Sequence, residues 1–143
     1  MRNIIAIILL FSGTFTWAQN MSVTDKITSL PGTYKHKRPC KNCTGVENTL
    51  TLYCKVPANG GNYSYKEEYI NSINGDHSSE VMGKWKIVDT AAGLDESSII
   101  IGLTANNKPG KTEYYMLGNG SMEQLDPNKK QIAPPFNLVL KKL

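Results

Sequence analysis

The sequence is short of the residues and motifs on which most enzymes depend. Its 143 residues include only three cysteines and two histidines. It contains no G-x-S-x-G nucleophile motif, no H-E-x-x-H zinc motif and no glycine-rich phosphate loop. These absences argue against a hydrolase, a metalloprotease or a nucleotide-binding enzyme. We therefore expect a protein without catalytic activity.

Long apolar runs are also lacking. The longest, Ile4 to Phe11, is much shorter than the roughly 20 residues that cross a bilayer. Arg2 precedes this run, and the small residues Thr16 and Ala18 follow it, which predicts a signal peptide over residues 1–18. No cysteine lies near the cleavage site, so we expect no lipid anchor and no transmembrane segment. The chain is predicted to be exported to the periplasm or the extracellular space, where disulfides can form.

A strong charge of one sign is missing as well. The formal net charge is +4, and the basic residues include the short runs Lys35–Arg38 and Lys129–Lys130. An excess of this size does not indicate a nucleic-acid-binding protein. Such runs are typical of solvated surface.

Helical periodicity is absent from the part of the chain that follows the signal peptide. Apolar residues alternate with polar ones instead, as in Leu50, Leu52 and Cys54, or Phe136, Leu138 and Leu140. This period of two indicates strands with one buried face. Turn-forming stretches rich in Gly, Asn and Pro separate them. The predicted strands lie near residues 32–36, 47–55, 62–71, 80–89, 97–104, 111–117, 121–125 and 136–142.

Seven or eight strands joined by short turns favour an all-β antiparallel meander. Closing the sheet into a small barrel removes its exposed edges, so we expect a barrel, with a β-sandwich as the alternative. Residues 19–30 are polar and are predicted to be a flexible lead-in. Residues 31–143 are expected to form one barrel domain.

Two of the cysteines form the motif Cys40-x-x-Cys43, on a loop between two predicted strands. Two thiolates at this spacing can bind one soft metal ion, Cu(I) or Zn(II). A closed zinc site would need four ligands, and the sequence has no second CxxC and no HxxxH. A thioredoxin-type redox pair would need a helix start beside a βαβ unit. A loop disulfide is the expectation for the oxidised protein, while a metal-binding pair and a redox couple remain alternatives.

Other soft ligands are few. His36 lies four residues before Cys40 and is a candidate third ligand to Cu(I) held by the reduced pair, although a histidine in a basic run is more often simply exposed. Cys54 shares a strand face with Leu50 and Leu52, so we expect a buried thiol that packs like a small apolar residue. The alternatives for Cys54 are a third metal ligand and a different disulfide partner. Glu47 is the carboxylate closest to the motif in sequence, and a surface salt bridge is its expected role.

The cysteine motif and the strand after it carry a resemblance. Gly32-Thr33-Tyr34, followed by Pro39-Cys40-x-x-Cys43-x-Gly45-Val46-Glu47-x-Thr49-Leu50-x-Leu52, resembles the opening of the N-terminal domain of NlpE-type copper-resistance lipoproteins. Later matches include Gly83-x-Trp85, Tyr114-Tyr115, Leu125-Asp126 and Phe136-Asn137. Together they span residues 31–142. The resemblance implies a small antiparallel barrel, lipocalin-like in shape, and an envelope location. It also implies a role in copper tolerance and envelope-stress sensing, with Cys40 and Cys43 as the functional pair.

Two features depart from the family pattern. Its members are commonly lipoproteins, whereas no lipidation cysteine is expected here, and some have a second, C-terminal domain for which this chain has no room. The hypothesis is a non-enzymatic binding or sensing module with a CxxC loop, acting on an unidentified envelope protein or small ligand. The first alternative is a lipocalin-like carrier of a small apolar ligand, with Tyr63, Tyr65 and Trp85 lining its cavity. The second is a structural partner-binding domain.

Overall fold

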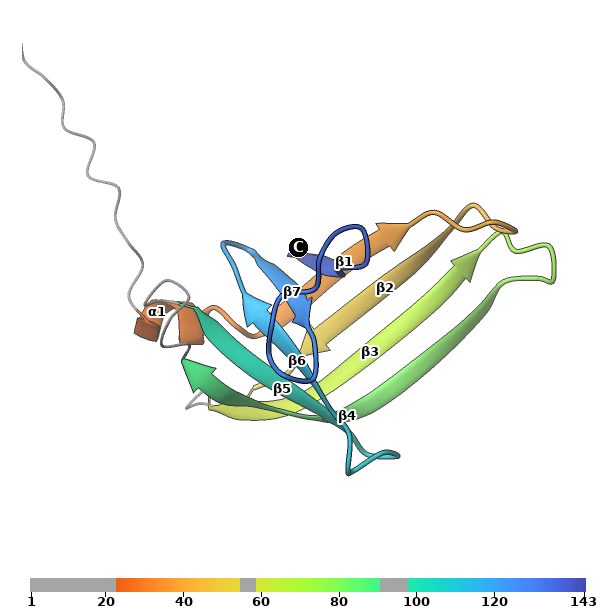
Figure 1. Cartoon of the computed structure of the whole chain (residues 1–143). Helices are drawn as coiled ribbons and strands as arrows, with labels where there is room; N and C mark the ends of the chain where they lie inside the picture. Colours follow the sequence, from red (N-terminus) through yellow and green to blue (C-terminus); the bar gives the residue numbers. More distant parts are fainter. Residues whose placement is uncertain (1–22, 55–58, 91–97) are drawn as a thin grey trace, which may run out of the picture.

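The computed structural model describes residues 23–54, 59–90 and 98–143. The predicted signal peptide, residues 1–18, lies outside them. One helix and eight strands follow one another along the chain (Figure 1). They are α1 (Val23–Thr28), β1 (Gly32–Arg38), β2 (Gly45–Leu52), β3 (Gly60–Ile70), β4 (His77–Thr90), β5 (Ile99–Ala105), β6 (Thr112–Leu117), β7 (Ser121–Leu125) and β8 (Val139–Lys142). Of the described residues, no helix is long and apolar enough to pass through a membrane.

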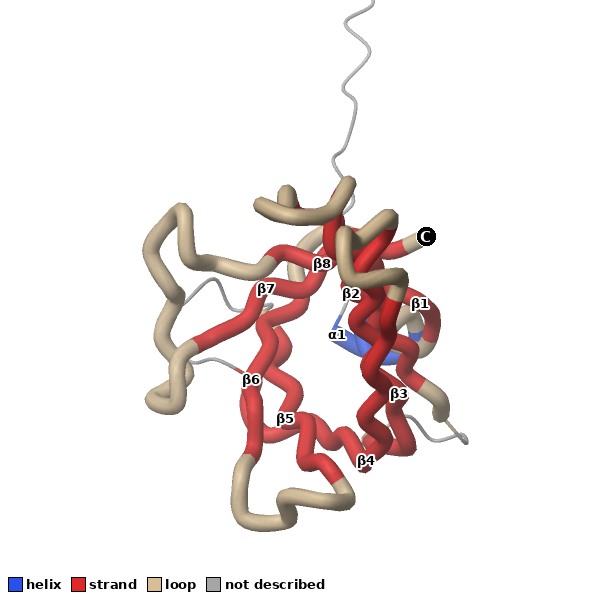
Figure 2. The backbone as a smooth tube through the Cα atoms, turned by 90° about the vertical axis from the view of Figure 1, so that its right-hand side faces the viewer, coloured by secondary structure: helices blue, strands red, loops and turns tan. Residues whose placement is uncertain are grey.

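The strands form one closed antiparallel barrel in which each strand pairs with its neighbour in sequence. The ring is completed where β8 pairs with β1, through Tyr34↔Lys142 and Lys35↔Lys141. Figure 2 shows the ring of strands, with α1 at its far end. The predicted all-β meander barrel is confirmed, and the sandwich alternative is wrong because a single sheet closes on itself.

Alternation along the strands separates the barrel interior from its surface. In β2 the side chains of Asn48, Leu50 and Leu52 are buried, while Thr49 and Thr51 between them are half-buried on the outer face. Strand side chains point alternately to the two sides of a sheet, so one face of each strand supplies the core. The core cluster comprises Leu30, Tyr34, Leu50, Leu52, Tyr63, Trp85, Ile99, Ile101, Leu103, Tyr115, Leu117, Met122 and Leu140.

The helix α1 corrects one expectation. Residues 19–30 were expected to be a flexible lead-in, but residues 23–28 are helical and Leu30 is 0 % exposed. Ile27 packs against the core, and the Tyr34 hydroxyl donates a hydrogen bond to the Leu30 carbonyl oxygen (2.8 Å). Ile27 and Leu30 cover this end of the barrel, a role that the mostly polar composition of the segment did not indicate.

The wall of the barrel has unequal height. β3 has 11 residues and β4 has 14, whereas β7 has 5 and β8 has 4. At about 3.3 Å per residue, β3 and β4 extend well beyond the opposite strands. Figure 1 shows β2, β3 and β4 projecting to the right of the closed ring. We call this part the extended wall and its end, formed by the β1–β2 and β3–β4 turns, the tip. The opposite end, covered by α1, is the closed end.

The last strand begins later than predicted. A strand was expected over residues 136–142, but β8 spans only Val139–Lys142. Pro134 and Pro135 lack the amide hydrogen needed for strand pairing, and Phe136 is 82 % exposed. The segment before β8 is therefore a loop.

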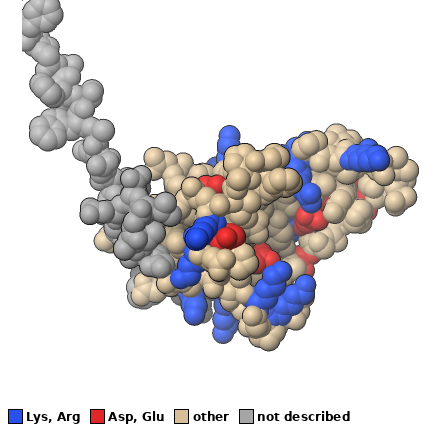
Figure 3. Space-filling view, in the orientation of Figure 1, with Lys and Arg blue, Asp and Glu red and all other residues tan. Residues whose placement is uncertain are grey.

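Charged side chains are mixed over the surface. In the view of Figure 3, Lys and Arg side chains alternate with Asp and Glu side chains. Three ion pairs join Lys35 to Glu47, Arg38 to Glu67 and Lys66 to Glu68. No single-sign surface is visible from this side.

Candidate functional site

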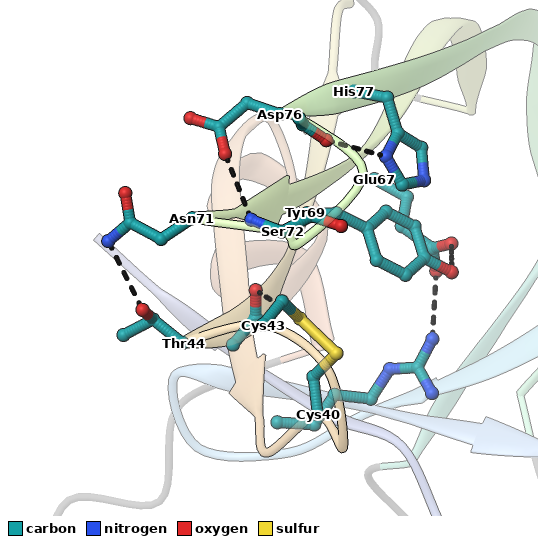
Figure 4. The surroundings of a disulfide bond; sticks show 12 residues. Cys40, Cys43, Thr44, Glu67, Tyr69, Asn71, Ser72, Asp76 and His77 are labelled. Carbon is teal, nitrogen blue, oxygen red and sulfur yellow. Dashed lines mark hydrogen bonds and ion pairs between the residues drawn. A yellow bond between two sulfur atoms is a disulfide. The ribbon is translucent and has the colours of Figure 1, made fainter.

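The cysteine motif lies at the tip of the extended wall. Cys40 and Cys43 are joined by a disulfide, with their Cα atoms 5.3 Å apart, in the turn between β1 and β2 (Figure 4). Both residues are half-buried. The disulfide expected of the oxidised protein is thus present.

The disulfide loop is bonded to the neighbouring β3–β4 turn. The Ile73 amide donates to the Asn42 carbonyl oxygen (3.1 Å), and the Thr44 amide donates to the Ile70 carbonyl oxygen (2.9 Å). The Asn71 side-chain amide also donates to the Thr44 hydroxyl (3.1 Å). Because these bonds join two turns, the position of the loop depends on the β3–β4 hairpin as well as on the disulfide.

A polar and aromatic cluster lies beside the disulfide (Figure 4). The Glu67 carboxylate accepts hydrogen bonds from Arg38 (3.1 Å) and from the Tyr69 hydroxyl (2.9 Å). The hydrogen bond to Glu67 raises the pKa of Tyr69. The Tyr69 ring stacks on His77, with ring centroids 4.2 Å apart. Sequence reasoning missed this cluster, because only strand register aligns Glu67 and Tyr69 with β4 and β2.

The two candidate carboxylates have different roles. Glu47 forms the expected salt bridge, 2.5 Å from the Lys35 ammonium on the outer face. Glu67, distant from the motif in sequence, is a carboxylate that the fold brings into the surroundings of the disulfide, as is Asp76. Its neighbour Glu68 bonds Lys66 instead, as expected for adjacent strand residues that point to opposite faces.

The structure does not bring His36 to the cysteines. Its Nδ1 atom lies 2.9 Å from the Val139 carbonyl oxygen, on the side of the barrel where β8 pairs. No group of three His, Cys, Asp or Glu side chains in the described part of the chain is close enough to hold a metal ion. A metal bound here would therefore have Cys40 and Cys43 as its protein ligands, and only after reduction, because the thiolate is the ligand.

Cys54 lies at the closed end, beyond the far end of β2. Seven strand steps separate Gly45 from Leu52, or roughly 20 Å at the usual rise, so Cys54 is remote from the disulfide. Its side chain packs against the core but is only half-buried, and its thiol lies 3.8 Å from the Gly60 carbonyl oxygen. Cys54 was predicted to be buried within a strand, but β2 ends at Leu52, and Cys54 follows the strand with a half-buried side chain.

A cavity of about 200 Å³ opens into the barrel interior. Tyr63, Tyr65 and Leu103 are among its walls, and Lys108 and Lys111 of the β5–β6 turn lie at its rim. Trp85, which was also expected to line a cavity, is 1 % exposed within the core, and its indole N–H donates to the Tyr53 carbonyl oxygen (2.9 Å). Two of the three expected aromatic side chains thus face this space. We call it the inner cavity.

Comparison with known proteins gives the family. The model of the NlpE N-terminal domain matches residues 34–134 of the chain. The chain belongs to the NlpE N-terminal domain family. The resemblance predicted from the cysteine motif is therefore confirmed, and no curated protein matches the chain.

Two solved structures resemble this NlpE-family barrel. One is the Cpx pathway activator NlpE from Escherichia coli, with a TM-score of 0.53 and 24% identity, covering 80% of this chain and 52% of that one. The chain spans about half the length of that protein. The other is a putative lipoprotein from Shewanella oneidensis, with a TM-score of 0.51 and 23% identity, covering 85% of this chain and 97% of that one. At these identities the likeness supports the fold.

Proposed function

We propose that this chain is a non-enzymatic, exported envelope protein that binds copper or senses envelope stress through its CxxC loop. The observation that carries the proposal is the disulfide loop itself, held at the tip of the extended wall by hydrogen bonds to a second turn. A loop that is ordered by its surroundings keeps two sulfur atoms close together after the disulfide is opened. The family membership supports the same role.

The pair of sulfur atoms fits Cu(I) better than Zn(II). Cu(I) is a soft ion that thiolates bind well, and it accepts few ligands, whereas a structural zinc site needs four. A dithiol reductant would supply the two electrons and two protons that convert the disulfide to two thiols. Cys40 and Cys43 would then lose their protons as they bind the ion.

Anaerobic titration with Cu(I) against a chromogenic chelator tests this proposal. We expect the reduced protein to take up one equivalent of Cu(I), the oxidised protein none, and the reduced Cys40→Ser/Cys43→Ser variant none. Cys54→Ser is the matched control and should bind like the parent protein. Equal Cu(I) uptake by the double-serine variant would refute the proposal.

A second candidate function, carriage of a small apolar ligand, rests on the inner cavity. The volume of about 200 Å³ is lined by Tyr63, Tyr65, Val81 and Leu103, together with the charged side chains of Lys108, Lys111 and Glu113. It is suited to a ligand of about one substituted ring, since a cavity of ~150 Å³ accommodates benzene. Ala105→Leu should fill the cavity and abolish binding of a phenyl compound in ligand-observed NMR. Met82→Leu changes an exposed side chain beside Val81 and should leave binding unchanged. Undiminished binding in Ala105→Leu would place the compound elsewhere. The remaining alternative, a structural domain that binds an envelope partner, needs no ligand.

A further inference from the structure

A second cavity, of about 390 Å³, lies at the mouth of the barrel. One side is formed by the extended wall and by Gln124 of β7, and the other by the loop that precedes β8. We call it the mouth cavity. Its volume is within the range of small-molecule sites, and β-barrel mouths are frequent places for such sites. Its lining residues include Arg38, Asn48, Glu67, Gln124, Phe136 and Asn137.

Flat polar groups line the wall side of the mouth cavity. They are the guanidinium of Arg38, the carboxylate of Glu67, and the amides of Asn48 and Gln124. Each of these groups presents two or more hydrogen-bonding atoms in one plane. Such a pair of atoms can bond two adjacent hydroxyls on a sugar ring. An amide donates to one hydroxyl and accepts from the other, a carboxylate accepts from both, and a guanidinium donates to both. The wall thus offers both hydrogen-bond donors and hydrogen-bond acceptors to a ligand in the cavity.

Bonds within the wall hold these groups in place. Arg38 donates to Glu67 (3.1 Å), and the Tyr65 hydroxyl donates to the Asn48 side-chain oxygen (3.0 Å). Asn48 is 2 % exposed, so its amide is fixed by packing as well. A ligand would therefore meet polar groups that are already ordered, which lowers the entropic cost of binding.

The charges on the wall oppose one another. Arg38 and Glu67 form an ion pair, so the wall carries no net excess that would select an anion or a cation. An apolar ligand is disfavoured, because it would leave these polar groups desolvated and without partners. In the described part of the chain, no group of three or more His, Cys, Asp or Glu side chains is placed to hold a metal ion. A neutral ligand with many hydroxyls is the kind best able to form hydrogen bonds with the polar groups of the wall.

Phe136 supplies an apolar surface at the rim of the same cavity. Its ring is 82 % exposed, so it is an apolar surface that a ligand can cover. The Phe136 amide donates to the Ala133 carbonyl oxygen (3.2 Å), and the Gln124 amide donates to the Leu138 carbonyl oxygen (2.9 Å). The first bond lies within the loop, and the second joins the loop to β7. The C–H face of a sugar ring is apolar and can cover such an aromatic ring.

We propose that the mouth cavity binds a neutral saccharide. One sugar ring lies against Phe136, and its hydroxyls bond Glu67 and Gln124. The mouth cavity shares Arg38 and Glu67 with the cluster beside the disulfide, but neither Cys40 nor Cys43 is among its lining residues, so saccharide binding requires neither reduction nor copper. It goes beyond the proposed function and does not depend on it.

Isothermal titration of the oxidised, metal-free protein tests this proposal. The probes are methyl β-glucoside, maltotriose, lactose and the trimer of N-acetylglucosamine. We expect saturable binding of at least one of them. Phe136→Ala should weaken that binding about tenfold without lowering the melting temperature, because the ring is exposed. Glu67→Gln keeps the shape of the side chain and should also weaken binding.

Tyr53→Ala is the matched control, because Tyr53 is an exposed aromatic residue that follows β2 at the closed end. Its affinity for the saccharide should equal that of the parent protein. Absence of saturable binding by all four probes would overturn the proposal. Binding that is unchanged in both Phe136→Ala and Glu67→Gln would overturn it as well, since the saccharide would then occupy another surface.

Discussion

Tyr65 lies between the two cavities. Its side chain lines both the inner cavity and the mouth cavity, and its hydroxyl bonds Asn48. Burial raises the pKa of Tyr65 to about 12, and the carboxylates of Glu67 and Glu113 add to this rise, while Arg38 opposes it. The neutral phenol is therefore the form that the folded barrel contains, and it can act as a hydrogen-bond donor over the whole physiological range.

Alkaline pH should destabilise the barrel through its buried tyrosines. Burial also raises the pKa of Tyr34 to about 12, from 10 in the unfolded chain. The hydroxyl groups of Tyr34 and Tyr65 thus bind their protons more tightly in the folded state than in the unfolded state. Their contribution to stability is fully present below pH 10 and is lost as the pH rises to 12.

Urea denaturation at pH 8, 10 and 11 measures this loss, and absorbance at 295 nm follows the phenolates. Tyr65→Phe should unfold at a lower urea concentration at pH 8 but should lose less stability on going to pH 11. An identical pH dependence in the variant would contradict the role given to Tyr65.

The disulfide should contribute little to global stability. It closes a very short loop, so the chain-entropy estimate is about 2 kcal/mol. We expect Cys40→Ser/Cys43→Ser to retain its β-type circular dichroism and to lose at most this amount in chemical denaturation. Complete unfolding of the variant would show that the fold requires the disulfide.

At the scale of elements, close contact between β4 and β5 depends on Gly83. An added Cβ at this position would lie 2.2 Å from the Thr104 carbonyl oxygen and 2.7 Å from the Tyr63 ring. The glycine in the Gly83-x-Trp85 match thus lets Tyr63 lie against the backbone of β4. Two neighbouring features, the buried Trp85 and the inner cavity, are positioned by this contact.

Gly83→Ala should therefore destabilise the barrel. Overpacking of this kind costs about 1–3 kcal/mol, measured by urea denaturation. Gly110→Ala is the control, because an added Cβ there meets no atom within 4 Å. Its free energy of unfolding should change by less than about 0.5 kcal/mol. Equal changes in the free energy of unfolding for the two substitutions would show that the close backbone contact at Gly83 does not restrict the size of the side chain there.

The segment before β1 should also matter for stability. Leu30 is fully buried beneath the closed end of the barrel, and its carbonyl oxygen is bonded by Tyr34. Leu30→Ala would leave a cavity and should cost about 2–5 kcal/mol in thermal or chemical unfolding. Leu143→Ala, at an exposed position, is the control and should cost almost nothing. A small effect of Leu30→Ala would mean that residues 23–30 can detach from the barrel without lowering its stability.

The strands were predictable because their signal is local. Alternation places Leu50 and Leu52 on one face without any knowledge of the neighbouring strand, and β2 through β7 lie close to their predicted ranges. The α1 segment was missed, although Val23, Ile27 and Leu30 follow the i, i+4, i+7 spacing of a helix, because the helix is only six residues long and its segment is mostly polar. β8 was predicted too long, because Phe136 continues the alternation but lies after two prolines.

The positions of the polar cluster and of both cavities depend on which strands pair and in which register, and the alternation of apolar and polar residues along one strand does not indicate this. Arg38, Glu67 and Tyr69 meet because β1, β2 and β3 pair in a particular register. A shift of one residue would place Glu67 on the outer face. The cysteine spacing, in contrast, is local, and for that reason the disulfide and the family could be predicted from the sequence.

At the scale of the whole molecule, the tip and the closed end should respond differently to reduction. Opening the disulfide should loosen the loop whose Asn42 carbonyl oxygen accepts a hydrogen bond from the Ile73 amide. The core around Leu50 and Ile101 is connected to this loop through the strands. Hydrogen exchange should therefore quicken at the Thr44 and Ile73 amides after reduction and stay unchanged at Leu50 and Ile101. Faster exchange throughout the barrel would mean that the disulfide affects global unfolding. Unchanged exchange at the tip would mean that hydrogen bonds alone hold the loop.

The pairing of β1 with β8 has a consequence for the kinetics of folding. Every other strand pair joins neighbours in sequence, whose turns close at small entropic cost. The short ladder at Tyr34 and Lys35 joins the two ends of the barrel domain, so it carries the largest loop-closure cost. We expect the hairpins to form first and this ladder last. Until it forms, β1 and β8 are unpaired sheet edges, and a second unfolded chain can pair with them. Refolding yield should accordingly fall as protein concentration rises.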